Sequence, residues 1–250
     1  MTASNLSWPY PKLIAHRGAG HAAPENTLAA MRAGARQGHT MVEYDLKLSL
    51  DGVPVLLHDD TVDRSSNGQG RACDLTYREL AKLDFGSWHS REYAGEPIPT
   101  LYAIAAFTQA NNLCSNIEIK PSAGTDADTG RRIAQFAAQL WSNADVPPLI
   151  SSFSEPALQA ALRAAPQLPR ALLLGETVPK DWPERLQRLR CVALNVHETV
   201  VTAALVHEVH AKGYKIAAWT VDEPARAHEL LEWGCDALFT NDIKPARPDF

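Results

Sequence analysis

The chain has 250 residues, of which 45% are hydrophobic and 21% are charged, proportions that are ordinary for globular proteins and exclude disordered, collagen-like and fibrous chains. The net charge is −5 and Lys and Arg form no run longer than Arg131-Arg132, which argues against a surface for nucleic acid or for an anionic membrane. No apolar stretch is long enough to span a bilayer, and residues 1–10 lack the features of a secretory signal. We therefore expect a soluble, cytoplasmic protein whose partner is a small molecule.

Short β-branched and apolar runs alternate with longer helical patterns along most of the chain, which is typical of parallel βαβ units. Apolar residues at helical spacing mark two of the intervening segments, 133–141 and 201–209. Eight such strands suggest a closed sheet, so residues 1–250 are expected to form a single α/β domain, a (βα)8 barrel of the TIM type. The predicted strands are 12–16, 41–46, 116–120, 149–153, 170–174, 191–196, 215–221 and 237–240.

The second strand is followed by an exception to this alternation. Val53–Leu57 comes after only Leu50-Asp51-Gly52, which is far too short for the crossover between parallel strands. We therefore predict a hairpin that turns at Asp51-Gly52 and returns antiparallel, bringing His58 near the level of Glu43.

Residues 60–99 lack the βα rhythm and are rich in Gly, Ser, Asp and charged residues, although Thr76–Leu83 could form a short helix. The chain rejoins the regular pattern at a predicted helix over 100–112. Loops of this length in a compact domain are commonly functional lids. We expect 60–99 to be a small capping insertion over the barrel mouth.

Three helix starts are marked by a polar residue followed by proline. Ser154 precedes Pro156, Asp181-Trp-Pro-Glu184 is predicted to form a capping box, and Asp222 precedes Pro224. Each is expected to cap the helix that follows a strand.

The four cysteines lie far apart in the chain and include no Cys-x-x-Cys pair. They are predicted to be reduced core thiols rather than a disulfide or metal framework. They are Cys73, Cys114, Cys191 and Cys235.

Chemically active side chains gather at the carboxyl ends of the predicted strands, where a (βα)8 barrel carries its active site. Side chains on a strand alternate between its two faces, so Glu43 and Asp45 share one face, and Glu118 and Lys120 share another. Both pairs can face the lumen. The residues at these strand ends are His16, Arg17, Glu43, Asp45, His58, Glu118, Lys120 and Trp219.

Three carboxylates that converge in a barrel repel one another unless a cation neutralises them. Oxygen ligands favour Mg²⁺ or Ca²⁺ over zinc, so Glu43, Asp45 and Glu118 are predicted to hold one divalent cation. The alternative is a purely ionic cluster in which these carboxylates pair with Arg17 and Lys120.

A cation beside Arg17 and Lys120 would make a strongly positive pocket in an acidic protein, which suits an anionic substrate such as a phosphate ester. His16 and His58 add two groups that exchange protons near neutral pH. One could accept a proton from a nucleophile while the other donates to a leaving oxygen, which is the chemistry that a phosphodiester requires.

The chain resembles the glycerophosphodiester phosphodiesterase family, and is most similar to its small cytosolic bacterial members. The resemblance rests on short motifs that occur in order over nearly the whole chain. They are Ala15-His-Arg-Gly18, Ala23-Pro-Glu-Asn-Thr27, Val42-Glu-Tyr-Asp45, Asp51-Gly52, Leu57-His-Asp-Asp60, Asn116-Ile-Glu-Ile-Lys-Pro121, Ser151-Ser-Phe153 and Trp219-Thr-Val221.

This resemblance implies a (βα)8 barrel with an inserted cap that hydrolyses glycerophosphodiesters to sn-glycerol 3-phosphate and a free alcohol. It also implies roles for residues. His16 and His58 match the general acid/base histidines, Arg17 and Lys120 match phosphate-binding groups, and the three carboxylates match the metal ligands.

For three further side chains, the sequence is consistent with either a role in the site or a purely structural role. Phe153 and Trp219 could form an apolar wall for the glycerol or alcohol part of the substrate, or could be ordinary packing at the barrel rim. Glu25 could anchor Arg17, or could be an acid in the first turn of a helix.

Other functions also stay open. A related barrel phospholipase would cleave intact phosphatidylinositol or sphingomyelin, but it must dock on a bilayer, and no aromatic-basic helix suited to that is evident. A barrel that only binds phosphodiesters is disfavoured because both histidines and all three carboxylates are present. Within the leading interpretation, attack by the glycerol 2-hydroxyl through a cyclic phosphate and direct attack by water are both possible, and the oligomeric state is open.

Overall fold

The computed structural model describes residues 8–244. Most of residues 1–10, which were predicted not to form a secretory signal, therefore lies outside the described residues. Within 8–244, nine strands form one sheet in the order β1-β9-β8-β7-β6-β5-β4-β2-β3, and β1 also pairs with β2. That last pairing closes eight parallel strands into a barrel with β3 outside it. The (βα)8 fold predicted from the alternating pattern is confirmed.

Every predicted barrel strand is present, and no strand end moves by more than two residues. In each pair of barrel neighbours the strands run parallel. The barrel strands are β1 (Leu13–Ala15), β2 (Met41–Leu48), β4 (Cys114–Ile119), β5 (Leu149–Ser152), β6 (Arg170–Leu174), β7 (Ala193–His197), β8 (Lys215–Trp219) and β9 (Ala237–Thr240).

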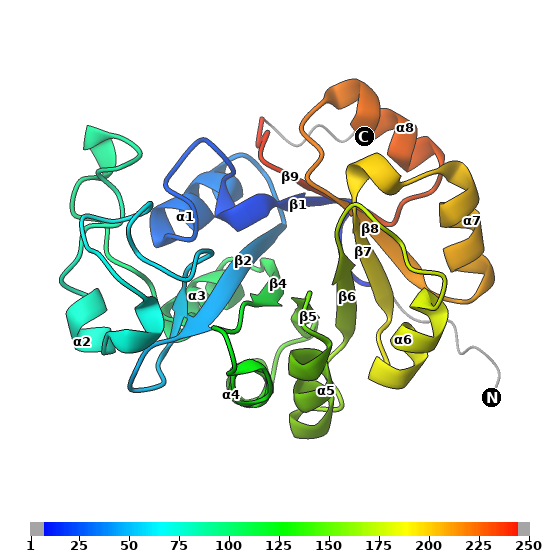
Figure 1. Cartoon of the computed structure of the whole chain (residues 1–250). Helices are drawn as coiled ribbons and strands as arrows, with labels where there is room; N and C mark the ends of the chain where they lie inside the picture. Colours follow the sequence, from blue (N-terminus) through cyan, green and yellow to red (C-terminus); the bar gives the residue numbers. More distant parts are fainter. Residues whose placement is uncertain (1–7, 245–250) are drawn as a thin grey trace.

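Helices surround the barrel and pack on the outward faces of the strands (Figure 1). The helical spacing at 133–141 falls largely in α4 and that at 201–209 falls largely in α7. None of the helices in the described part of the chain is long and apolar enough to cross a membrane. The helices are α1 (Leu28–Arg36), α3 (Leu101–Ala110), α4 (Asp126–Leu140), α5 (Glu155–Ala164), α6 (Trp182–Leu189), α7 (Ala203–Ala211) and α8 (Pro224–Glu232).

Of the three predicted helix caps, one is confirmed and two are wrong. Ser154 caps α5, since its hydroxyl accepts a hydrogen bond from the Ala157 N–H. Asp181 makes no capping bond and pairs with Arg185 instead. Asp222 is not the cap of α8, because its carboxylate accepts from the Asn241 N–H at 2.7 Å. Pro183 and Pro224 still lie in the first turns of α6 and α8, where the missing N–H of proline would have no helical partner.

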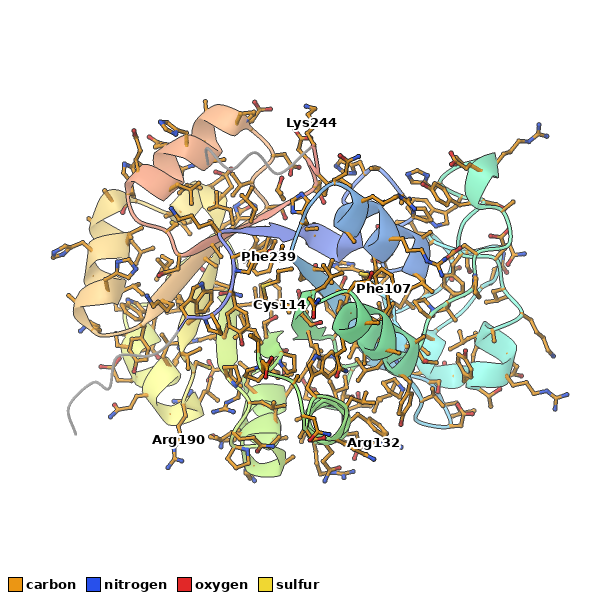
Figure 2. All side chains as sticks on the ribbon, turned by 180° about the vertical axis from the view of Figure 1, so that it is seen from behind. Phe107, Cys114, Arg132, Arg190, Phe239 and Lys244 are labelled. Carbon is orange, nitrogen blue, oxygen red and sulfur yellow. The ribbon has the colours of Figure 1, made fainter. Side chains whose placement is uncertain are left out.

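The amino-terminal half of the lumen is filled by apolar side chains. The lumen side chains of β6 to β9 are mostly small. The larger Phe239 of β9 lies toward the middle of the molecule, whereas Arg190 and Lys244 lie at its edge (Figure 2). The buried lumen residues are Tyr10, Ile14, Met41, Leu149, Ala171, Ala193, Ala217, Ala237 and Phe239.

The hairpin predicted after the second strand is confirmed. β3 (Pro54–Leu56) runs antiparallel to β2, with Leu46 opposite Leu56. The turn uses Gly52 at a φ of 77°, a conformation that glycine adopts without strain. As a result, His58 returns to the same cavity that Glu43 lines.

Residues 60–99 contain η2 (Ala72–Asp74), α2 (Tyr77–Leu80) and η3 (Arg91–Tyr93), so the helix predicted at 76–83 is real but shorter. The segment lies beside α1, beyond the carboxyl end of β2 (Figure 1), and Glu96 accepts a hydrogen bond from the Ala29 N–H at 3.0 Å. That it caps the barrel mouth stays a prediction. It shares a separate apolar core with the hairpin, consisting of Val55, Leu57, Val62, Ala72, Leu80, Phe85 and Ile98.

All four cysteines are free thiols, as predicted, but the prediction that all of them lie in the core holds only for two. Cys191 and Cys235 are buried, and Cys73 and Cys114 are partly buried.

Candidate active site

A cavity of about 180 Å³ opens at the carboxyl ends of the barrel strands. The nine residues predicted to be catalytic, substrate-binding or metal-binding all line it, although they come from six strands or the loops that follow them. They are His16, Arg17, Glu43, Asp45, His58, Glu118, Lys120, Phe153 and Trp219.

The three carboxylates converge because of strand register. Glu43 and Asp45 are two residues apart and so share one face of β2, and Asp45 lies opposite Glu118 of β4. One oxygen from each carboxylate lies within 4.8 Å of the others, and all three residues are buried. Glu43 Oε1 has no hydrogen-bond partner among residues 8–244. An oxygen-only donor set of this kind, with an unpartnered buried oxygen, fits Mg²⁺ or Ca²⁺.

Burial acts on these carboxylates in different ways. It raises the pKa of Glu43 well above its ordinary value, with the charges of Asp45 and Glu118 adding to the effect. Burial and Asp45 raise the pKa of Glu118 to about 7. Burial opposes ionisation of Asp45 as well, but Lys120 and Arg17 hold the pKa of Asp45 below its usual value. The cluster is therefore short of positive charge.

Arg17 and Lys120 make the ion pairs expected of an ionic cluster. Lys120 Nζ lies 2.8 Å from Glu118 Oε1 and 3.7 Å from Asp45 Oδ1. Arg17 Nε lies 3.6 Å from Asp45 Oδ2, while the Arg17 backbone N–H donates to Glu43 Oε2 at 2.9 Å. Two cationic side chains nevertheless face three carboxylates, and this imbalance leaves room for a further cation.

Each histidine in the cavity is held through its Nδ1 atom. Nδ1 of His58 lies 2.7 Å from Asp59 Oδ1, and Nδ1 of His16 lies 2.8 Å from Asn241 Oδ1. Both partners are acceptor oxygens, so Nδ1 carries the proton and Nε2 keeps its lone pair. Burial lowers the pKa of both histidines, which favours this neutral form near pH 7. Either imidazole can therefore take up a proton.

Several residues that position these groups had no role in the sequence interpretation. Asn26 donates to Asp45 Oδ2 at 2.8 Å and accepts from the Asp45 N–H at 3.0 Å. Asn26 has a φ of 58°, a left-handed conformation in which Asn is enriched, so its presence in the Ala23–Thr27 motif was a usable signal. The partnership of Asn241 with His16 joins residues 225 positions apart and had no local signal.

Glu25 contacts Arg17 rather than beginning a helix. Its Oε1 accepts from Arg17 Nη1 at 2.8 Å. The helix α1 begins only at Leu28, after the N-cap Thr27, and has no acidic residue in its first turn. The geometry is that of an anchor for Arg17.

The remaining wall of the cavity is neutral. Phe153 is 45% exposed and meets Trp219 edge to face, with ring centroids 5.4 Å apart. This exposure does not fit ordinary core packing at Phe153, whereas Trp219 also packs against the lumen residues. Five further residues of the lining were not singled out in the sequence: Asn116, Ser151, Leu173, Thr220 and Phe239.

Comparison with known proteins agrees with this geometry. The model of the glycerophosphoryl diester phosphodiesterase family matches residues 16–244. The chain is 34% identical over 230 residues to a glycerophosphodiester phosphodiesterase of Caldanaerobacter subterraneus subsp. tengcongensis, covering 92% of this chain and 93% of that one.

Two solved structures share the fold over nearly the whole chain. An Oleispira antarctica phosphodiesterase, determined in complex with the product sn-glycerol-3-phosphate, superposes with a TM-score of 0.87 and 36% identity, covering 94% of each chain. A glycerophosphodiester phosphodiesterase of Agrobacterium tumefaciens gives a TM-score of 0.81 at 25% identity, covering 95% of this chain and 100% of that one. The chain therefore belongs to the glycerophosphoryl diester phosphodiesterase family and is an enzyme of that class.

Proposed function

We propose that this enzyme hydrolyses small glycerophosphodiesters, such as glycerophosphocholine and glycerophosphoethanolamine, to sn-glycerol 3-phosphate and a free alcohol. The observation that carries the proposal is the convergence of two neutral histidines, two cationic side chains and three carboxylates in one cavity. The product bound to the Oleispira antarctica relative supports the same substrate class.

Glu43, Asp45 and Glu118 would hold one divalent cation, Mg²⁺ or Ca²⁺. Such a cation supplies positive charge that offsets the phosphate oxygens and makes a nearby hydroxyl more acidic. Arg17 and Lys120 both lie beside Asp45, next to the proposed cation site. Their positive charges bind phosphate oxygens of the substrate.

The two histidines move the protons. One imidazole accepts a proton at Nε2 from the oxygen that attacks phosphorus, and the other, once protonated, donates to the alcohol oxygen as its bond to phosphorus breaks. Attack by the glycerol 2-hydroxyl gives a cyclic phosphate that water opens with the roles reversed, whereas attack by water gives the product in one step. A substrate without the 2-hydroxyl that turns over normally would rule out the cyclic route.

The neutral wall and the insertion account for the rest of the substrate. Phe153 and Trp219 pack against its glycerol or alcohol part. Residues 60–99 cap the mouth of a single catalytic domain and select the alcohol, although none of the residues of 8–244 that line the cavity belongs to this segment. A cytoplasmic location, with no nucleic-acid or membrane partner, stays part of this prediction.

The experiment is to measure release of sn-glycerol 3-phosphate from both substrates after EDTA treatment and after addition of Mg²⁺ or Ca²⁺. Metal-dependent release that is lost in His16→Ala and in Glu43→Ala is expected. His207→Ala is the control, because His207 lies exposed on α7. Release that survives EDTA and both substitutions would refute the proposal.

A further inference from the structure

Arg64 of the insertion contacts carboxylates from two different parts of the chain. Its Nε donates to Asp59 Oδ2 at 2.6 Å. Its Nη1 and Nη2 donate to the two oxygens of Glu25, both at 2.8 Å. The planar guanidinium is suited to such a fork, since it presents several N–H groups at fixed angles.

Each of these carboxylates in turn holds a side chain of the cavity. Asp59 uses its other oxygen to accept from His58 Nδ1 at 2.7 Å. Glu25 accepts from Arg17 Nη1 at 2.8 Å. Arg64 is thus the centre of a chain of hydrogen bonds from the histidine after β3 to the arginine after β1.

The insertion fixes where Arg64 lies. The neighbouring Val62 is fully buried in the core of the insertion, and its N–H donates to the Gly70 carbonyl at 3.0 Å. The guanidinium carbon lies 5.8 Å from the centroid of the Trp88 ring. The backbone that carries Arg64 is therefore anchored, although the side chain is 44% exposed.

Stabilisation of the fold does not account well for this arrangement. Exposed ion pairs contribute little to the free energy of unfolding, because solvent screens the charges. Three hydrogen bonds to two carboxylates that each hold a cavity residue are better explained by a need for fixed geometry at the site.

We propose that Arg64 is a positioning residue, which bridges Glu25 and Asp59 and thereby holds Arg17 and His58 in a fixed relation across the cavity. The inference rests on the proposed function of those two side chains. It makes the catalytic arrangement depend on the insertion, through one arm that ends at a phosphate-binding group and another that ends at a proton-transfer group.

The two arms predict separable kinetic effects. Asp59→Asn is expected to lower kcat, since it loosens His58, and Glu25→Gln is expected to raise KM, since it loosens Arg17. Arg64→Met is expected to do both and to lower kcat/KM for glycerophosphocholine roughly 10- to 100-fold, the usual effect of removing a group that orients a site residue. Added to Asp59→Asn, Arg64→Met should lower kcat little further, because the two side chains act as one unit.

Arg78→Met is the matched control, since Arg78 also belongs to the insertion, is exposed, and forms no ion pair within residues 8–244. Arg64→Met is expected to unfold at the same Tm as this control and to differ from it in kinetics. Equal kinetics in the two variants, or full additivity with Asp59→Asn, would overturn the proposal.

A readout without turnover separates this inference from the proposed function. Ring-nitrogen chemical shifts of His58, identified by their absence in His58→Gln, report the hydrogen bond at Nδ1. They should change in Arg64→Met and in Asp59→Asn but not in Arg78→Met. Unchanged shifts in Arg64→Met would refute the positioning role, whereas wild-type protein that releases no sn-glycerol 3-phosphate would refute only the proposed function.

Discussion

The two sides of the cavity differ sharply in chemistry. β1, β2, β4 and the returning hairpin supply every charged or histidine side chain of the lining, whereas β5, β6, β8 and β9 supply hydroxyl, aliphatic and aromatic groups. The charged side is also the one that Asn26, Glu25 and Arg64 support through hydrogen bonds. The barrel therefore carries the side chains that we propose transfer protons and bind phosphate on different strands from the apolar side chains that we propose contact the rest of the substrate.

The largest effect is expected from a carboxylate on the charged side. Glu43→Gln removes a predicted ligand of the cation, and the loss of its charge stabilisation should lower kcat/KM by roughly 10³-fold or more. The thermal stability of the variant in EDTA should equal or exceed that of the wild type. Burial and two neighbouring carboxylates raise the pKa of Glu43 and disfavour its charged form, so a neutral Gln costs the metal-free fold nothing. Activity and thermal unfolding of the same preparation test this, and a large fall in both would mean that Glu43 is structural.

The histidine that the hairpin brings to the charged side comes next. His58→Ala should lower kcat by roughly 10²- to 10³-fold, in the range of a lost general acid or base, with a smaller change in KM. Steady-state kinetics with glycerophosphocholine give both constants, and His207→Ala serves again as the exposed control. A kcat within a few-fold of wild type would remove His58 from the proton-transfer pair.

A smaller effect is expected on the neutral side. Phe153→Ala removes an exposed ring that meets Trp219, and should raise KM roughly 2- to 10-fold with little change in kcat, as expected for loss of aromatic contact. Tyr102→Ala is the control, because Tyr102 is similarly exposed, at 44%, and meets Phe136 edge to face on the outside of the barrel. A fall in kcat without a change in KM would break the proposed division between the two sides.

The smallest effect concerns pH. In metal-free protein the folded-state pKa of Glu118 is raised from 4.5 to about 7, so the folded state binds the proton more tightly than the unfolded chain. Its contribution to stability is fully present at acidic pH and is lost as pH rises from about 4.5 through about 7. Tm in EDTA should therefore fall over that range, and Glu118→Gln should reduce the slope. An unchanged slope in the variant would show that other groups dominate.

Local patterns in the sequence predicted which side chains reach the cavity. Alternation on β2 placed Glu43 and Asp45 on the lumen face, and the short link at Asp51-Gly52 predicted the hairpin that returns His58. The same kind of reasoning failed for Asp222, which lies one residue before Glu223, the N-cap of α8, and binds Asn241 instead. A local rule holds only where no distant group competes for the same side chain.

The face of a strand on which a side chain lies, and whether a segment forms a strand, depend on backbone stereochemistry over a few residues. Both could therefore be predicted from the sequence. The hydrogen-bond partners of the site residues could not be predicted in this way, because they depend on closure of the barrel and on the packing of the insertion. The pairing of Ala15 with Thr240 brings Asn241 to His16, and the insertion brings Arg64 to Glu25, a residue 39 positions away. Hydrogen bonds between such distant segments exist only once strand register and loop packing have been set, and these are properties of the whole fold.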